Sequence, residues 1–349
     1  MSSTPRLADL DVIAPNLKRR LSGVTSTIIR LVPLQAREIG IAATGPGLPE
    51  HVPHVPLTAL FALPRDRWRV WHARRNTEML LGLVLRHVFR RKLRLLFTTA
   101  SQRAHSGYTK WLIRQMEHVV AVSQKSAAYL EREATVILHG INLQEFTPPE
   151  DKAALRRALG MDPDAVLIGC IGRIRAQKGT DVFVDAMLAL LPDRPEAQAI
   201  VLGRATEKHV SFLADLKARI AAAGLSDRIH FPDEVPPDQV ARWYQALDLF
   251  VAPQRWEGFG LTPIEAMACA VPVVATDVGA FSELLDPPDV GLLVPRDDLA
   301  ALTAATAEML SRDLAAEGAA GRARVEAAFS IEREAKALIA VYRDLLARA

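Results

Sequence analysis

Short apolar runs alternate with longer amphipathic stretches along the whole chain, and this alternation limits the possible folds more than any other feature. Amphipathic stretches such as residues 180–191, 207–223 and 297–310 are typical of helices. Strands that alternate with helices form parallel sheets covered by helices on both faces. The runs typical of buried strands are residues 12–14, 39–43, 69–71, 93–98, 119–122 and 135–138, then 166–171, 199–202, 249–252, 271–275 and 291–294. A chain of 349 residues is too long for one ordinary hydrophobic core. We therefore expect an α/β chain with two doubly wound parallel sheets.

The division between the two sheets is expected in the segment 142–151, where Pro148 and Pro149 interrupt regular structure. We predict an N-terminal domain over residues 1–145, a C-terminal domain over 146–329, and a C-terminal helix over 330–349 that packs back toward the N-terminal domain. In doubly wound folds, ligands bind at loops that follow the carboxyl ends of strands. The loops 19–25, 172–179 and 257–261 are therefore the candidates for a site.

Composition favours a cytoplasmic protein. Half of the residues are hydrophobic, yet no apolar run reaches membrane-spanning length, and the first residues lack the pattern of a signal peptide. The two cysteines, Cys170 and Cys269, lie in apolar surroundings without paired spacing. Neither a disulfide nor a metal site is expected from them.

The charge is distributed unevenly along the chain. Residues 1–147 carry 21 Lys and Arg against 10 Asp and Glu, whereas residues 148–349 carry 22 against 30. The first domain is therefore expected to face an anionic partner, either a nucleic acid or an acidic lipid surface. A basic stretch between residues 79 and 97 fits docking on an anionic membrane, and equally a packed helix with a solvated basic edge; its cations are Arg86, Arg90, Arg91, Lys92 and Arg94.

Two glutamates stand eight residues apart in the stretch EGFGLTPIEAMACAVPVVATDVG, residues 257–279. The glycines and Pro263 exclude one continuous helix between Glu257 and Glu265. Thr262 and Glu265 have the spacing of a capping box, which places Glu265 in the first turn of a helix. The loop 258–261 can present backbone N–H groups to an anion, and carboxylates beside a phosphate would hold hydroxyls instead. This combination indicates a sugar bound beside a phosphate site.

Arg173 and Lys178 are fixed cations in the glycine-bounded loop GRIRAQKG, residues 172–179. Fixed cations of this kind can stabilise a diphosphate leaving group without a metal ion, although a solvated pair has the same pattern. No GxGxxG follows either leading strand and no GxxxxGK[ST] is present, which disfavours dinucleotide enzymes and P-loop ATPases.

These motifs together resemble the retaining glycosyltransferases of family 4, which have the GT-B fold of two Rossmann-like domains. The resemblance extends to DRIHFPDEVP (227–236), DLFVAPQRWEGFG (248–260) and VILHGIN (136–142). It implies that Arg173 and Lys178 hold the donor diphosphate, that Glu257 contacts the transferred sugar, and that Glu265 binds the ribose. The donor contacts that it further implies are backbone N–H groups of Phe259, Gly260 and Leu261, and close approach of the N-terminal domain at Gly23.

The N-terminal half resembles a narrower group, the lipopolysaccharide core mannosyltransferases of alphaproteobacteria. The similar stretches include VIAPNLKRRLSGVTSTIIRLVPLQ, WHARRNTEML and FTTASQRAHSGYTKWL. This resemblance implies transfer of mannose from GDP-mannose to the Kdo of a lipid A precursor, on the cytoplasmic face of the inner membrane. No metal cofactor and no nucleic acid are then expected. The residues predicted to hold the acceptor's carboxylates and phosphates are Arg74, Arg75, Arg103 and His105.

The sequence departs from family 4 at residues 71–75, where many relatives carry His-x-His with the second histidine near the reacting sugar. Here His72 is followed by Arg74. We predict His72 as a catalytic residue, with a structural His72 and an acceptor-binding Arg74 as the alternative. Two other functions stay open: a GT-B sugar-nucleotide epimerase, and a non-catalytic module that binds anionic lipid.

Overall fold

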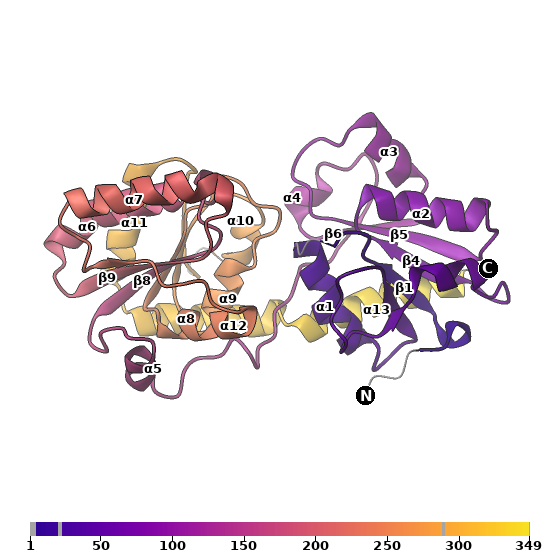
Figure 1. The fold of residues 1–349 in the computed structure, drawn as a ribbon, viewed down its shortest axis with the longest axis horizontal. Coiled ribbons are helices and arrows are strands. Elements are labelled where there is room, and N and C mark those ends of the chain that lie inside the picture. The colour runs from indigo at the N-terminus through magenta and orange to yellow at the C-terminus, as the bar shows by residue number, and fades with distance from the viewer. Residues whose placement is uncertain (1–4, 20–22, 288–289, 349) are drawn as a thin grey trace. The chain divides into compact units, whose positions relative to one another are not determined.

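The structure, a computed structural model, describes residues 5–19, 23–287 and 290–348, and it divides the chain into two compact units. Unit 1 consists of Met1–Gly140 and Ile331–Ala349, and unit 2 consists of Ile141–Ser330 (Figure 1). The predicted division between residues 145 and 146 therefore lies a few residues beyond the observed one. Each unit contains one parallel sheet, as the alternation of strands and helices predicts.

Unit 1 is built on a seven-stranded sheet in the order β3-β2-β1-β4-β5-β6-β7, and its paired strands are parallel. The predicted strands are all present, with ends shifted by up to two residues. Only the two-residue β3 is new, because it is too short to show a periodic pattern. The bounds are β1 Val12–Pro15, β2 Ile41–Thr44, β3 His54–Val55, β4 Arg69–Ala73, β5 Leu93–Thr99, β6 His118–Ala121 and β7 Thr135–Val136.

Helices cover both faces of this sheet. On one face α1 packs against the long C-terminal helix α13, and their apolar side chains share a core with β1, β2 and β4. On the other face α2 packs against α3 over a core centred on Trp71 and Leu95. The helices of unit 1 are α1 Gly23–Gln35, α2 Asn76–His87, α3 Gly107–Arg114, α4 Gln124–Ala127 and α13 Ile331–Ala347, with the 3₁₀ helices η1 Leu7–Asp9 and η2 Leu57–Ala62.

Helix α13 returns from the end of unit 2 to pack on the sheet of unit 1. Its buried residues Ile331, Leu338 and Tyr342 recur at helical spacing, which gives the helix one apolar face. That face lies in the same core as Ile28 and Leu31 of α1. The C-terminal helix predicted from residue 330 thus begins one residue later and forms part of unit 1.

Unit 2 is built on a six-stranded parallel sheet in the order β10-β9-β8-β11-β12-β13. Its strands are β8 Val166–Ile171, β9 Ala197–Leu202, β10 Ile229–His230, β11 Leu249–Ala252, β12 Val273–Thr276 and β13 Leu292–Val294. Its α-helices are α5 Lys152–Ala158, α6 Thr180–Leu190, α7 Val210–Ala222, α8 Val240–Ala246, α9 Thr262–Ala268, α10 Phe281–Leu284, α11 Leu299–Ser311 and α12 Leu314–Ala328. Its 3₁₀ helices are η3 Ala176–Lys178, η4 Leu191–Asp193, η5 Glu207–His209 and η6 Pro237–Gln239.

Candidate functional site

The loop that follows β8 in unit 2 places Lys178 against Glu257. The loop ends at Gly179, whose φ of +69° brings the backbone close to β11: a Cβ there would lie 1.8 Å from the carbonyl oxygen of Pro253. Only glycine fits this position without displacement. The ammonium group of Lys178 forms an ion pair with the carboxylate of Glu257, and each side chain is 19% exposed. The sequence predicted both residues as site residues, but not that they pair.

Glycines hold the Glu257 side chain in a narrow space. Gly260 has a φ of +91°, and a Cβ there would lie 2.8 Å from Cγ of Glu257 and 2.2 Å from the ring of Phe281. A Cβ at Gly279 would lie 3.0 Å from Cβ of Glu257. The second carboxylate oxygen of Glu257 accepts a hydrogen bond of 3.1 Å from the N–H of Gly258. The carboxylate is therefore fixed in direction, as a substrate-orienting group requires.

Arg173 differs from Lys178 in having no internal partner. Its side chain is exposed, and among the residues that the structure describes it makes no ion pair or side-chain hydrogen bond. The two predicted donor ligands of the loop are thus in different states: Lys178 is neutralised by Glu257, and Arg173 is available to an anion. A diphosphate that reached this loop would meet Arg173 directly and would compete with Glu257 for Lys178.

The predicted capping box of α9 is wrong. The helix begins at Thr262, with Leu261 in the N-cap position and no side-chain cap there. The carboxylate of Glu265 instead accepts a hydrogen bond of 2.9 Å from the hydroxyl of the buried Tyr244. Burial, and then the Glu265 carboxylate, hold the pKa of Tyr244 well above its ordinary value, so this hydroxyl stays protonated and donates. Glu265 still lies in the first turn of a helix, where a negative charge is favourable.

The backbone around Phe259 has mixed roles. The Phe259 side chain is buried, and its carbonyl oxygen accepts a hydrogen bond of 3.0 Å from the N–H of Ala280. The buried side chain and the bonded carbonyl group of Phe259 thus hold the loop 258–261 in place between β11 and α9. Donation to a ligand by the N–H groups of Phe259, Gly260 and Leu261 stays a prediction.

In unit 1, the ring of His72 is completely buried on β4 and both of its nitrogens have partners. Nδ1 lies 2.7 Å from the hydroxyl of Tyr342 and 3.3 Å from Nη2 of Arg74, while Nε2 lies 2.6 Å from Oγ1 of Thr98. A guanidinium only donates, so Nδ1 accepts and Nε2–H donates to Thr98. Burial, and then the charge of Arg74, hold the pKa of His72 well below its ordinary value. A neutral, enclosed ring does not reach a substrate in this conformation, which favours the structural alternative for His72.

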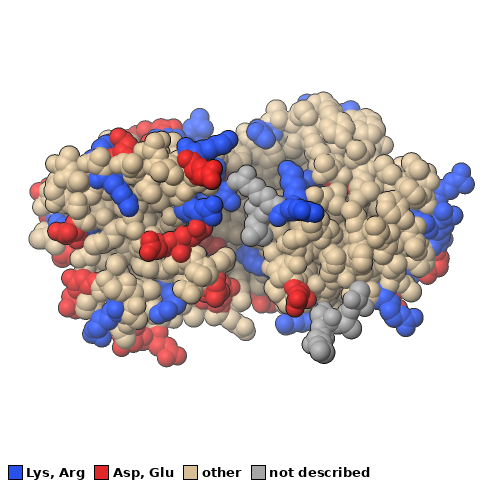
Figure 2. Space-filling view, viewed as in Figure 1, with Lys and Arg blue, Asp and Glu red and all other residues tan. Residues whose placement is uncertain are grey.

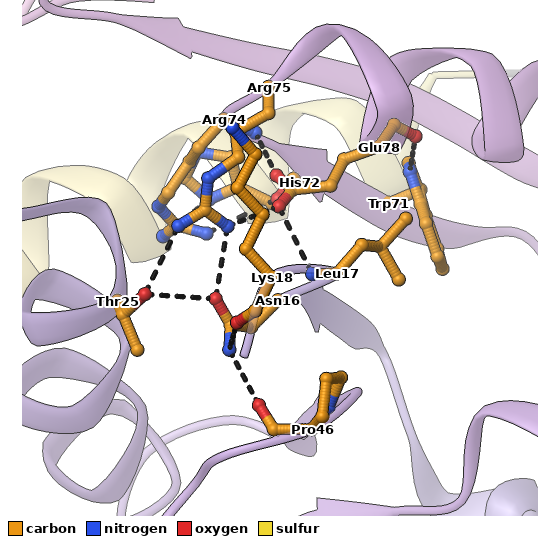
Figure 3. A network of polar contacts seen from close by, with 10 residues as sticks. All are labelled: Asn16, Leu17, Lys18, Thr25, Pro46, Trp71, His72, Arg74, Arg75 and Glu78. Carbon is orange, nitrogen blue, oxygen red and sulfur yellow. Dashed lines mark hydrogen bonds and ion pairs between the residues drawn. The ribbon is translucent and has the colours of Figure 1, made fainter. Parts of the chain in front are cut away.

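Arg75 lies in a polar network of unit 1, which Figure 3 shows. Its guanidinium donates to Oδ1 of Asn16 at 3.0 Å, to Oε1 of the fully buried Glu78 at 2.6 Å, and to Oγ1 of Thr25 at 3.1 Å. The other oxygen of Glu78 accepts a hydrogen bond of 2.8 Å from the N–H of Arg74. The network ties the ends of β1 and β4 to α1, so Arg75 holds the framework, although the sequence predicts it as an acceptor ligand.

The three other predicted acceptor residues, Arg74, Arg103 and His105, line one cavity of about 540 Å³. The cavity lies where β4 and β5 end and α3 begins. Nε2 of His105 is buried and has no hydrogen-bond partner within the described part of the chain, and Arg103 is exposed. Burial, then Lys110 and Arg103, lower the pKa of His105. The remaining lining residues are Asn76, Phe97, Thr99, Ala100, Ser101, Ala104, Ser106 and Thr109.

The donor contact of Gly23 stays a prediction, and the basic stretch 86–94 is largely engaged inside unit 1. Gly23 is the exposed first residue of α1, with no atom within 4 Å of a Cβ placed on it, and the adjacent residues 20–22 lie outside the described residues. Arg86 and Arg94 both pair with Glu117. Arg91 donates to the carbonyl oxygen of Leu63 at 2.7 Å. Lys92 donates to the carbonyl oxygen of Asp66 at 3.3 Å. Four of the five cations therefore make contacts inside unit 1.

Comparisons with known proteins show the family of this chain. A family model described as "Glycosyl transferases group 1" matches residues 165–312. The chain is 56% identical over 350 residues to the lipopolysaccharide core biosynthesis mannosyltransferase LpsB of Rhizobium meliloti (strain 1021), covering 97% of this chain and 99% of that protein. It is 51% identical to the lipopolysaccharide core biosynthesis mannosyltransferase LpcC of Rhizobium leguminosarum bv. viciae, covering 98% of each.

The chain belongs to the group 1 glycosyltransferases. The resemblance stated from the motifs is thereby confirmed. A solved structure of Anabaena Alr3699/HepE in complex with UDP superposes on this glycosyltransferase with a TM-score of 0.84, covering 96% of this chain and 100% of that chain at 19% identity. The superposition confirms the GT-B fold.

Sequence reasoning missed Arg255, which holds the Lys178 loop of this glycosyltransferase. Its guanidinium donates to both carboxylate oxygens of Asp181, at 2.7 and 3.0 Å, and also to Asp297 and the carbonyl oxygen of Ala176. The bond to Asp181 raises the pKa of Arg255. The only signal in the sequence was the charge of Asp181, two residues after Gly179 and opposite in sign to the loop cations.

Within the described residues of this glycosyltransferase, no group of three or more His, Cys, Asp or Glu side chains could hold a metal ion. In the same ranges, no helix has both the length and the apolar character needed to span a bilayer.

Proposed function

We propose that this glycosyltransferase moves mannose from GDP-mannose to the Kdo region of a lipid A precursor in lipopolysaccharide core biosynthesis, with retention at the anomeric carbon. The reaction takes place on the inner face of the inner membrane. The observation that carries the proposal is similarity along the whole chain, at 56% and 51% identity, to two lipopolysaccharide core mannosyltransferases. The similarity extends over unit 1 as well as unit 2.

The donor side of the proposal rests on the Lys178–Glu257 pair. Arg173 and Lys178 bind the diphosphate and stabilise the charge that grows on it as the bond to the sugar breaks. When the diphosphate takes over Lys178, the carboxylate of Glu257 is released to accept hydrogen bonds from hydroxyls of the transferred sugar. Glu265, fixed by Tyr244 at 2.9 Å, accepts from the ribose hydroxyls. These groups supply the charge without a metal ion.

The acceptor side rests on the cavity of unit 1. Kdo is a sugar acid, and the lipid A precursor carries phosphates, so the acceptor is anionic at several points. Arg74 and Arg103 are cations on the cavity wall, and His105 has a buried nitrogen there that finds no hydrogen-bond partner among the described residues. The hydroxyl-bearing residues Ser101, Ser106 and Thr109 add neutral partners for sugar hydroxyls.

An assay with a panel of sugar nucleotides, with and without the Kdo-bearing lipid, tests this function. We expect labelled mannose to enter the lipid only from GDP-mannose, to keep the donor's anomeric configuration, and to do so in EDTA. Donor conversion without acceptor would identify an epimerase, and binding of lipid without any turnover would identify a non-catalytic module. Activity abolished by EDTA and restored by magnesium would overturn the metal-independent mechanism.

A further inference from the structure

Because the strands of its sheet are parallel, unit 1 has one edge at the carboxyl ends of the strands and an opposite edge at their amino ends. The two edges carry different residues. The acceptor cavity lies at the carboxyl ends of β4 and β5. The basic segment 88–92 lies at the opposite edge, immediately before β5 begins at Leu93. The seven residues of β5 separate these edges by roughly 20 Å. A membrane that presented its headgroups to the cavity would therefore contact the carboxyl edge, away from most of the basic segment.

Helix α3 stands at the carboxyl edge, beside α2 on the surface of unit 1 (Figure 1). Its inner face is formed by Thr109, Leu112 and Ile113, which are buried. Its outer face carries two large aromatic side chains, Tyr108 at 50% exposure and Trp111 at 44%, whose rings stack with centroids 6.3 Å apart. Exposed aromatic pairs of this kind are unusual on a surface that meets only water.

Tyr129, at 44% exposure, adds a third aromatic ring next to α3. It lines a small cavity together with Lys110 and Arg114 of α3. Arg132, three residues further along, donates to the carbonyl oxygens of Ile113 and Met116 at 3.1 and 2.7 Å, which fastens this segment to the end of the helix. We call Tyr108, Trp111 and Tyr129 the aromatic surface.

The surroundings of the aromatic surface carry a positive balance. Residues 101–132 contain five Lys and Arg against two Asp and Glu. Both acids are already paired, Glu131 with Lys110 and Glu117 with Arg86. In the view of Figure 2, most of the acidic side chains lie on unit 2. This balance is complementary to anionic lipid headgroups.

The aromatic surface is continuous with the acceptor cavity. Ser106 caps α3 and accepts from the N–H of Thr109 at 3.3 Å, and both residues line the cavity. Asn76 of α2 donates to Oγ1 of Thr109 at 2.8 Å, which joins α3 to the cavity wall. Tyr108 lies between Ser106 and Thr109 in the chain, so one helix presents a cavity wall and an aromatic ring side by side.

We propose that the aromatic surface docks in the headgroup layer of an anionic bilayer and thereby brings the cavity to the headgroup of a lipid-linked acceptor. Indole and phenol rings suit this layer because each combines an apolar body with a polar tip. Nearby cations add attraction to anionic lipid that decays within a Debye length. Docking itself stands on the structure of unit 1, and delivery of the acceptor rests on the proposed function.

Vesicle binding tests the docking surface. The variant Tyr108→Ser/Trp111→Ser is compared with Phe61→Ser/Val88→Ser, which removes two exposed apolar side chains from outside the aromatic surface, Val88 among them at the amino edge. Vesicles of phosphatidylcholine and phosphatidylglycerol in equal parts should bind the first variant about tenfold more weakly than the parent, and the control within about twofold. Far-UV circular dichroism checks that both variants are folded. Equal binding by the parent and the first variant would overturn the proposal, as would a larger loss in the control.

Transfer assays separate docking from chemistry. With the lipid acceptor in vesicles, Tyr108→Ser/Trp111→Ser should lose most of the activity, whereas with a water-soluble deacylated acceptor it should match the parent. Equal losses on both acceptors would place these rings in the acceptor site and overturn a docking role. If the parent transfers to neither acceptor, the proposed function fails, while the vesicle measurement still decides the docking surface.

Discussion

The Lys178 loop of unit 2 and the Arg75 network of unit 1 use the same kinds of side chain for different ends. In unit 2, Arg173 is exposed, and Lys178 has a partner that is itself a predicted sugar ligand. In unit 1, Arg75 makes hydrogen bonds to Asn16, Glu78 and Thr25 inside the unit. The first arrangement can rearrange around a ligand, whereas the second cannot do so without leaving a buried carboxylate unpaired.

The difference shows what distinguishes a binding cation from a structural one. Glu78 is fully buried, and desolvating a carboxylate is costly unless a cation compensates it. The guanidinium of Arg75 supplies this compensating cation. Glu257 and Lys178 are both partly exposed, so their pair costs less to open. The burial of the partner carboxylate, more than the type of cation, decides which pair a diphosphate or a sugar acid can enter.

The largest expected effect tests the structural assignment of Arg75. In Arg75→Gln, the buried carboxylate of Glu78 loses its compensating cation and keeps its backbone hydrogen-bond donors. The free energy of unfolding should therefore fall by about 3–5 kcal/mol. Urea unfolding measures this loss. The matched control Arg103→Gln, at an exposed position, should change stability by less than about 0.5 kcal/mol and should raise the acceptor KM. A fully stable Arg75→Gln with a raised acceptor KM would restore Arg75 as an acceptor ligand.

The next effect tests the Lys178 loop. Lys178→Gln removes a cation that stabilises the negative charge growing on the diphosphate leaving group. It should therefore lower kcat about 100-fold, equivalent to about 2.7 kcal/mol of transition-state stabilisation. Lys208→Gln, an exposed lysine in the same unit, serves as the control. Glu257→Gln should cripple transfer just as strongly but bind nucleoside diphosphate at least as tightly as the parent, since it frees Lys178. Weaker diphosphate binding by Glu257→Gln would contradict the exchange of partners.

A pH effect follows from His72. Its pKa is well below the ordinary value of 6.5 when folded, so below that pH the unfolded chain binds the additional proton. Stability from this group is therefore present at neutral pH and is lost as the pH falls, with a slope of at most about 1.4 kcal/mol per pH unit. Unfolding curves of the parent and His72→Gln across this range measure the difference. A catalytic His72 would instead show itself in the pH dependence of kcat without this stability slope.

The smallest effect concerns Tyr244 and Glu265. Tyr244→Phe removes the hydroxyl that donates to Glu265 and should cost about 1 kcal/mol of stability. It should also weaken nucleoside diphosphate binding a few-fold, because the carboxylate loses its fixed direction. Glu265→Gln should weaken the same binding more, since it changes the ligand group itself. Calorimetric titration with the nucleoside diphosphate distinguishes the two; unchanged affinity in both variants would remove Glu265 from the donor site.

Much of the fold was predictable because it depends on local pattern. Apolar runs such as Val166–Ile171 and Leu249–Ala252 have the same bounds in the structure as in the prediction, since a buried parallel strand must be apolar throughout. The two-residue strands β3 and β10 were missed because two residues carry no period, whereas the equally short β7 lies in the longer run 135–138. The capping box of α9 was mispredicted because Thr262 and Glu265 match the local pattern, while the hydroxyl of Tyr244 reaches Glu265 from another helix.

By itself, the sequence determined the two parallel sheets, the glycine-bounded loops at the ends of their strands, and the charged residues within those loops. Those properties arise from neighbours along the chain. Only the tertiary structure decided that Lys178 pairs with Glu257, that Glu78 engages Arg75, and that His72 is enclosed by Tyr342 of the distant C-terminal helix. These pairings join residues far apart in sequence or depend on burial, and the energy of a charge depends on what surrounds it after folding.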